Sequence, residues 1–350
     1  MGMELTLQVF IYFRVHPLCD SQCLLRTLVG VAGGNTNGVA RGANVYGLKV
    51  MDAAGQGFTS AVIAAIDYVL ANRAPGRGSV INLSLGGPCD TSDCSVDPTV
   101  LAVNAAVAAG VVVVVAAGNE FCNAASSSIG SPPAAANAIT VGATTRLDAL
   151  AYYSNYGQMV DILAPGSSII SACSTLAGNC DANGEATKTG TSIAAPHVAG
   201  VAAQLLQKNS AATPAQVLRA MQCDAIEGII TLPSRDTITR NLFLQIPKND
   251  GLFGTCIPGN GCTSNCSSVG HCLAAHTSSS YGSTEDICYC NGGYGSGDCS
   301  VSFAQARTNQ CASAMTVTIS MTASSSKCYR SAFLVTLDSR SRNTNLTTIQ

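Results

Sequence analysis

The chain has 350 residues, which is enough for about two domains of ordinary size and excludes a small peptide. Only 11% of the residues are charged and the net charge is -2, so nothing in the composition favours binding to nucleic acid. The 47% of apolar residues argues against disorder, because such a chain can bury enough surface to offset its conformational entropy. The 17 cysteines favour an oxidising compartment, and we therefore expect a secreted protein.

The first 28 residues form an atypical N-terminal segment. An apolar run from Leu5 to Phe13 is similar to the core of an export signal. However, Glu4 stands where a basic residue is usual, and Arg14 ends the run early. The segment is therefore a poor match to a signal peptide.

A second apolar stretch, Pro98 to Asn119, carries no charge and is long enough to cross about 30 Å of hydrocarbon. A membrane span is the alternative here to ordinary secondary structure. Asp97 and Pro98 are typical of a helix cap and first helical position, and Gly110 is typical of a helix end. The five valines from Val111 to Val115 favour a strand buried on both faces. We therefore expect a helix followed by a strand, and no membrane span.

Strands and helices alternate between residues 45 and 222. The predicted strands are Val45 to Met51, Val80 to Leu83, Val111 to Val115, Ala138 to Gly142 and Val160 to Leu163. Between and after them we expect a helix capped by Thr59 or Ser60, the helix from Pro98, a helix at Ser192 to Lys208, and a helix that Thr213 caps, with Pro214 in its first position, running through Met221. This alternation predicts an α/β fold with a mainly parallel sheet and right-handed crossovers. Ligand sites in such folds lie at the carboxyl ends of the strands.

The alternation stops near Pro247, and residues 248–300 are rich in glycine, serine and cysteine. The spacing of six cysteines resembles an epidermal growth factor-like (EGF-like) module, and the resemblance implies disulfides 262 with 272, 266 with 288 and 290 with 299. A zinc site is the alternative, but paired C-x-x-C knuckles are absent. We expect a disulfide-rich module here, with a possible extracellular partner. Residues 301–350 give no functional signal.

Two polar residues are candidates for catalysis. Ser192 stands at the start of the last long helix, where the helix dipole and free N–H groups stabilise negative charge, although its ordinary interpretation is a helix cap. Asn119 follows the valine strand, where its amide can donate to an oxyanion or simply form a turn. His197 is five residues beyond Ser192 on the helix and points in another direction, so we expect it to be structural.

Four segments together resemble the subtilisin-like serine proteases, and in particular the proteinase K and aqualysin branch. They are Gly190 to Gly200, Ser84 to Gly87, Ala116 to Asn119 and Ser154 to Gly157. The resemblance covers about residues 29–246 and implies a subtilisin-like peptidase domain over residues 29–247. It implies an endopeptidase with Ser192 as the nucleophile and Asn119 as the oxyanion donor, acting on protein or peptide substrates.

The same resemblance implies a substrate-binding groove. An extended peptide would lie between Ser84-Leu85-Gly86 and Gly55-Gln56-Gly57, as a strand added between two backbone edges. Ala116-Ala117-Gly118 would line the pocket for the residue before the cleaved bond. Small side chains leave that pocket open, which favours an apolar or broad preference.

A structural calcium ion is also implied by the family. Asp161 matches a calcium ligand, joined by the backbone carbonyls of Ala136 and Ala138. Oxygen ligands suit calcium, although a lone aspartate at a strand end is often only structural.

The sequence departs from the family in one essential respect. Such enzymes carry an Asp, a His and a Ser in that order, yet no histidine occurs between residues 17 and 196, and Leu24 occupies the place of the general base before the Gly30 to Gly34 turn. Asp20 lacks the strand and the glycine-rich turn that surround the family's acid. We therefore expect an N-terminally incomplete peptidase domain, from a truncated or mis-spliced reading, that is inactive as written. The alternative is a catalytically dead extracellular binding or adhesion protein.

Overall fold

The computed structural model describes part of the chain. Described are residues 8–12, 21–51, 57–73, 76, 78–89, 93–124, 130–173, 180–233 and 239–246, together with short strands at 270–273, 287–290, 294–295 and 301–302. Side chains are described from residue 26 to residue 246 within these ranges.

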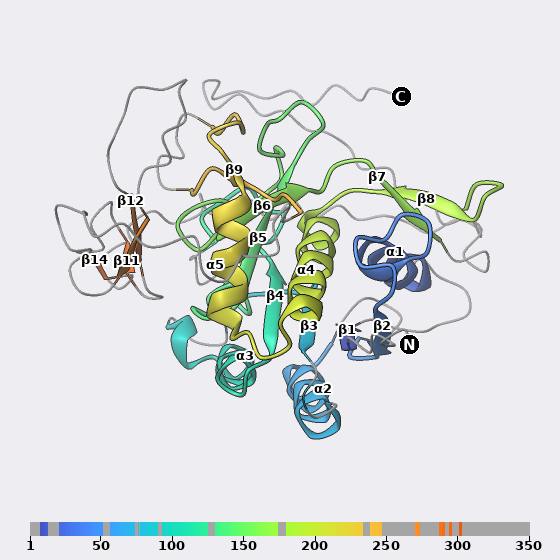
Figure 1. Cartoon of the computed structure of the whole chain (residues 1–350), viewed down its shortest axis with the longest axis horizontal. Coiled ribbons are helices and arrows are strands. Elements are labelled where there is room, and N and C mark those ends of the chain that lie inside the picture. The colour runs from blue at the N-terminus through green and yellow to red at the C-terminus, as the bar shows by residue number, and fades with distance from the viewer. Residues whose placement is uncertain are drawn as a thin grey trace, which may run out of the picture. The chain divides into compact units, whose positions relative to one another are not determined.

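An eight-stranded sheet forms the centre of the described structure (Figure 1). Its order is β2 (Asn44–Leu48), β1 (Gln8–Tyr12), β3 (Ser79–Leu83), β4 (Val112–Ala116), β5 (Ile139–Thr144), β6 (Ile162–Pro165), β10 (Leu242–Phe243) and β9 (Ile226–Glu227). All neighbouring strands are parallel except β9, which runs antiparallel to β10. The predicted α/β fold with a mainly parallel sheet is confirmed.

Helices cover both faces of this sheet because its middle strands are apolar on both sides. In β4, Val112 and Val114 pack in one core cluster, while Val113 and Val115 pack in the other, as the alternation of a strand requires. The helices α1 (Ser21–Gly33), α4 (Thr191–Lys208) and α5 (Pro214–Asp224) contribute to the first cluster. The helices α2 (Thr59–Asn72) and α3 (Pro98–Ala108) contribute to the second.

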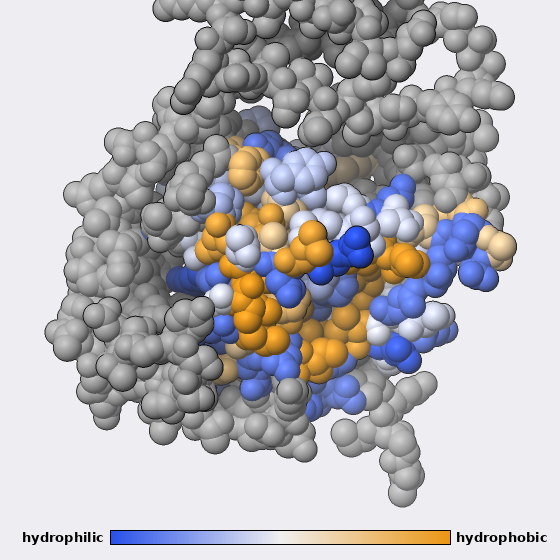
Figure 2. All heavy atoms as spheres, turned by 90° about the horizontal axis from the view of Figure 1, so that it is seen from above, coloured by the Kyte–Doolittle hydropathy of each residue, from blue (hydrophilic) through white to orange (hydrophobic). Residues whose placement is uncertain are grey.

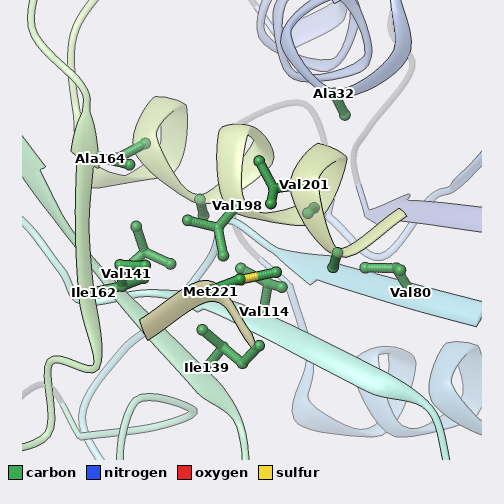
Figure 3. Packing of buried hydrophobic residues seen from close by; sticks show 14 of the residues in the cluster. Ala32, Val80, Val114, Ile139, Val141, Ile162, Ala164, Val198, Val201 and Met221 are labelled. Carbon is green, nitrogen blue, oxygen red and sulfur yellow. The ribbon is translucent and has the colours of Figure 1, made fainter. Parts of the chain in front are cut away.

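The helix α4 is the centre of the first cluster (Figure 3). Val198 and Val201 lie on its sheet-facing side, and Val114 and Val141 come from strands beneath them. Small residues at many helix positions allow this close approach. The start of α4, which carries Ser192, is therefore fixed by the packing of the whole helix on the sheet.

Helix caps follow the sequence predictions at two of three starts. Asp97 accepts hydrogen bonds from Thr99 N (2.9 Å) and Val100 N (3.3 Å) at the start of α3. Thr213 and Gln216 form a capping box at the start of α5. The cap of α2, however, is Phe58, which makes no side-chain capping bond, so the prediction of a Thr59 or Ser60 cap is wrong.

The apolar stretch from Pro98 to Asn119 consists of α3 and β4, as expected. Within the described residues, no helix is both long and apolar enough to cross a bilayer. Exposed large apolar residues such as Phe58, Leu147 and Tyr152 occur on the surface. Figure 2 shows apolar side chains next to polar ones on one face. Individually exposed apolar residues of this kind are normal for a folded protein.

The N-terminal segment supplies a strand that we did not expect. β1 lies between β2 and β3 and pairs in parallel with both, Gln8 standing opposite Asn44 on one side and Ser79 on the other. The sheet is therefore continuous from β2 to β3, although we expected an N-terminally incomplete domain. Strand pairing uses backbone groups, so the short apolar run at residues 8–12 can take a place between two parallel strands. α1 then crosses residue 28, where we placed the domain boundary.

A two-stranded ribbon, β7 (Ile169–Ala172) with β8 (Glu185–Lys188), lies outside the sheet. The Cys173–Cys180 disulfide joins two residues of the connection between these strands, and Cys89–Cys94 spans a short segment before α3. Cys122 and Cys223 are also disulfide-bonded. These disulfides agree with the oxidising compartment inferred from composition.

Beyond residue 246, two small antiparallel pairs are described. They are β11 (Gly270–Leu273) with β12 (Ile287–Cys290) and β13 (Tyr294–Gly295) with β14 (Val301–Ser302). The rest of residues 248–300 lies outside the described residues, as does all of 303–350. The EGF-like module and its three disulfides stay predictions.

Candidate active site

Ser192 is the second residue of α4, two positions after the glycine that caps the helix. Gly190 is the N-cap and has a φ of 149°, a conformation that side chains with a Cβ rarely adopt. The N–H groups of a first helical turn have no acceptor within the helix, so the Ser192 N–H is available to a ligand. The Ser192 Oγ is 3.4 Å from the Ser84 carbonyl oxygen, a long hydrogen bond.

Ser84 holds the backbone of Ser192 from the neighbouring strand. The Ser84 hydroxyl donates to the Ser192 carbonyl oxygen at 2.8 Å and itself accepts from Asn82 Nδ2 at 2.9 Å. Both Ser84 and Asn82 are buried. The nucleophile candidate is therefore tied to the end of β3.

Asn119 lies beside the same helix start. Its Oδ1 accepts hydrogen bonds from the N–H of Thr191 (2.8 Å) and from the Thr191 hydroxyl (3.0 Å). The Thr191 Oγ1 also accepts from Gly118 N at 3.2 Å. Because Oδ1 is engaged in this way, Asn119 Nδ2 is free to donate, and it has no partner among the described residues. The two residues singled out from the sequence, Ser192 and Asn119, are thus brought together.

This arrangement can stabilise an oxyanion. The Ser192 N–H and Asn119 Nδ2 are two hydrogen-bond donors at the positive end of a helix, next to a hydroxyl nucleophile. A general base is not in reach among the described side chains. His197 is the sole imidazole among them, and its Nδ1 bonds to Ile193 O at 3.0 Å, one turn back along α4. Burial lowers its pKa, so it is neutral at neutral pH and structural, as expected.

The predicted substrate edge is partly described. Ser84-Leu85-Gly86 follows the carboxyl end of β3, and the next residue, Gly87, forms an antiparallel bridge with Ser131. Gly55 and Gln56 lie outside the described residues, while Gly57 is exposed and bridges Met51. The two edges are therefore not both defined.

The predicted pocket residues lie at the carboxyl end of β4, of which Ala116 is the last residue. Ala116 packs in the first core cluster. Ala117 packs in a separate, smaller cluster of buried residues that includes Met159 and Leu163. Ala116 and Ala117 are 5% and 0% exposed as whole residues, so as arranged they offer a ligand almost no accessible surface. Gly118, with a φ of 101°, is the residue that leaves the strand toward Asn119.

Asp161, the predicted calcium ligand, forms an ion pair. Its Oδ1 is 3.0 Å from the Arg240 guanidinium, and its Oδ2 accepts from Thr140 N at 2.9 Å. Burial raises the pKa of Asp161 to about 6, although Arg240 and the Thr140 N–H act in the opposite direction. As arranged, the carboxylate does not fit a cation, because Arg240 already supplies the positive charge. Nothing in the sequence around residue 240 indicates this contact.

The calcium prediction also named two carbonyls. Ala136 is exposed and Ala138 is buried just before β5. No cluster of three or more His, Cys, Asp or Glu side chains suited to a metal occurs in the described part of the chain. Calcium would have to displace Arg240 from Asp161, and its binding stays a prediction.

The comparison with known proteins agrees with the site. The model of the subtilase family matches residues 27–254, which is well over half of the chain. The chain therefore belongs to the subtilase family.

Among its relatives, the extracellular serine proteinase of Thermus sp. (strain Rt41A) is 41% identical over 220 residues, covering 63% of this chain and 49% of that protein. Proteinase T of Parengyodontium album is 43% identical over 188 residues, covering 51% and 57%. A crystal structure of a cold adapted subtilisin-like serine proteinase shares 31% identity and a TM-score of 0.59 over 69% of this chain and 89% of that chain. The chain thus spans about half the length of the two named relatives.

Proposed function

We propose that this chain is built for serine endopeptidase chemistry, with Ser192 as the nucleophile that forms an acyl-enzyme. The observation that carries the proposal is the hydrogen bonding of Asn119 Oδ1 to Thr191, which leaves Asn119 Nδ2 free beside Ser192. Membership of the subtilase family and the similarity to serine proteinases support it.

In the proposed reaction, the Ser192 Oγ attacks the carbonyl carbon of an extended peptide. The negative charge on the former carbonyl oxygen is stabilised by the Ser192 N–H and Asn119 Nδ2. The proton of Ser192 must pass to a base and then to the leaving amine, after which water hydrolyses the acyl-Ser192 ester. No described side chain accepts that proton, and the sequence has no histidine between residues 17 and 196. We infer that the chain as given is inactive toward peptides.

Further parts of the proposal rest on the family. Substrates are proteins or peptides that lie along Ser84-Leu85-Gly86, and the protein is secreted, which the disulfides and an extracellular relative support. Residues 248–300 form an EGF-like module that binds an extracellular partner. Calcium, if it binds at Asp161, stabilises the fold and takes no part in the reaction.

Restoring the missing groups tests the proposal. The unchanged chain should neither hydrolyse casein nor react with a fluorophosphonate probe. In subtilisin, loss of the Ser or His alone lowers kcat by about a millionfold. A version whose first 29 residues are replaced by a subtilase front segment with its Asp and His should do both, and Ser192→Ala should abolish both. A folded version that stays unlabelled would refute the protease proposal.

One structural observation favours the second candidate, an extracellular binding protein with a dead protease domain. β1 completes the sheet between β2 and β3. A pseudoenzyme is expected to keep such a strand, because the fold must still bury its faces. Saturable binding of extended peptides to the unchanged chain, together with an unlabelled restored version, would establish this alternative.

A further inference from the structure

Asn155 is a buried residue whose hydrogen-bonding capacity is fully used by one loop. Its side chain is 0% exposed. The Oδ1 accepts from Glu120 N and from Cys122 N, both at 3.1 Å. The Nδ2 donates to Ala117 O at 2.8 Å and to Glu120 Oε2 at 2.7 Å. A primary amide offers two donors and an acceptor with two lone pairs, so no capacity remains.

The partners of Asn155 lie on both sides of Asn119. Ala117 precedes it by two residues, and Glu120 and Cys122 follow it. The Asn155 backbone N–H adds a fifth bond, to Gly118 O at 3.0 Å. The backbone around Asn119 is therefore held by Asn155, while the side chain of Asn119 is held by Thr191.

The loop needs such support because its backbone is unusual. Gly118 has a φ of 101°, and Phe121 is a residue with a Cβ at a φ of 52°. A Cβ added to Gly118 would lie 2.2 Å from Asn155 Nδ2. A residue with a Cβ costs free energy in the left-handed region, and it keeps that conformation only where contacts with the surrounding structure hold it there. Contacts that pass this close to the backbone leave the loop little freedom.

We propose that Asn155 is a positioning residue for the oxyanion donor, which sets where Asn119 Nδ2 lies relative to Ser192. The inference deepens the proposed function and rests on it. Asn155 makes no hydrogen bond to Ser192 in the described structure, and it reaches the predicted pocket only through the backbone carbonyls of Ala117 and Gly118, so its effect on the reaction passes through the loop. A donor misplaced by a fraction of an ångström stabilises the oxyanion less, while the binding of a distant part of the substrate is unchanged.

The test uses the chain as it exists. Amide hydrogen exchange is measured for Glu120 and Cys122 in the unchanged chain and in Asn155→Asp, which keeps the shape and the acceptor but loses both donors. We expect faster exchange throughout residues 117–122. The matched control is Asn241→Asp, because Asn241 similarly bridges Ile230 N (3.1 Å) and Ile230 O (2.6 Å), on another loop. Equal exchange of residues 117–122 in the unchanged chain and Asn155→Asp would overturn the proposal.

A kinetic measurement separates positioning from general stability. The enzyme for this measurement is the version restored with a subtilase front segment, whose Asp and His supply the base for Ser192, and the substrate is an acyl-amino acid p-nitrophenyl ester. We expect Asn155→Asp to lower kcat by about 10- to 100-fold with KM changed by less than about threefold. Asn119→Ala should lower kcat at least as much, and Asn241→Asp should leave both constants unchanged.

A paired variant keeps the test informative if Asn155→Asp folds poorly. The single variant Glu120→Gln still offers an amide oxygen that accepts from Asn155 Nδ2. In the double variant, Glu120→Gln with Asn155→Asp, the amide introduced at position 120 can donate to the carboxylate introduced at position 155. We expect the double variant to recover part of the lost kcat. The positioning role would be overturned if Asn155→Asp raised KM by the same factor by which it lowered kcat, and the double variant recovered none of the lost kcat. If the restored version and its Ser192→Ala variant cleave the ester equally, the proposed function fails, whatever the exchange result.

Discussion

Asn119 Oδ1 accepts two hydrogen bonds from Thr191, one from its backbone N–H and one from its hydroxyl. This pair joins the end of β4 to the start of α4, and so fixes the oxyanion candidate on the helix that carries Ser192. Thr191 is 0% exposed, so no water replaces a lost bond there.

The first prediction concerns that pair. Thr191→Val removes the hydroxyl but keeps the volume, leaving Gly118 N without its acceptor and Asn119 Oδ1 with one bond fewer. We expect a loss of about 1–3 kcal/mol in the free energy of unfolding, measured by urea denaturation. Thr191→Ser keeps the hydroxyl and is the control. Equal stability of the Val and Ser variants would contradict the prediction.

The second prediction concerns calcium and Arg240. A ligand that binds only the folded state at 100 times its Kd stabilises it by about 2.7 kcal/mol, so a bound ion separates melting curves recorded with and without chelator. We expect Arg240→Gln to enlarge that separation, because it removes the cation that competes for Asp161. Asp161→Asn should abolish it. If the melting curves with and without chelator are identical for both the unchanged chain and Arg240→Gln, the prediction that calcium binds at Asp161 is wrong.

The third prediction concerns the pH dependence of stability at His197. Burial lowers the pKa of His197 in the folded state, so below its ordinary value of about 6.5 the unfolded chain binds a proton that the folded chain does not. The free energy of unfolding should therefore fall as the pH falls through this range. In His197→Gln this part of the decrease should be lost, as measured by denaturation between pH 5 and 8. An unchanged slope in the variant would show that His197 does not contribute.

The fourth prediction concerns the cysteines of residues 248–300. About 50 residues with so few apolar side chains cannot build a stable core without covalent links. Peptide mapping of secreted protein without reduction should show Cys262, Cys266, Cys272, Cys288, Cys290 and Cys299 in disulfides. The Cys89–Cys94 and Cys173–Cys180 pairs serve as internal references. Free thiols at the six positions in secreted protein would refute the extracellular assignment.

Local pattern was sufficient for most of the fold. The valines of β4 alternate between two clusters, and Asp97 and Thr213 cap the helices that they precede. These features depend on residues within one or two turns of each other, which is why they are readable from sequence. The boundaries of β2 and β6 differ by one to three residues from the prediction, since strand ends depend on their partners.

The sequence alone determined the α/β class, the serine at the start of α4 and the asparagine after β4. Tertiary structure decided which side chains meet. It brought together Thr191 with Asn119, Asp161 with Arg240, and Asn155 with the loop around Asn119. It also placed β1 between β2 and β3. The physical reason is that periodicity and capping report on neighbours along the chain, whereas these contacts join segments brought together only when the helices pack on the sheet.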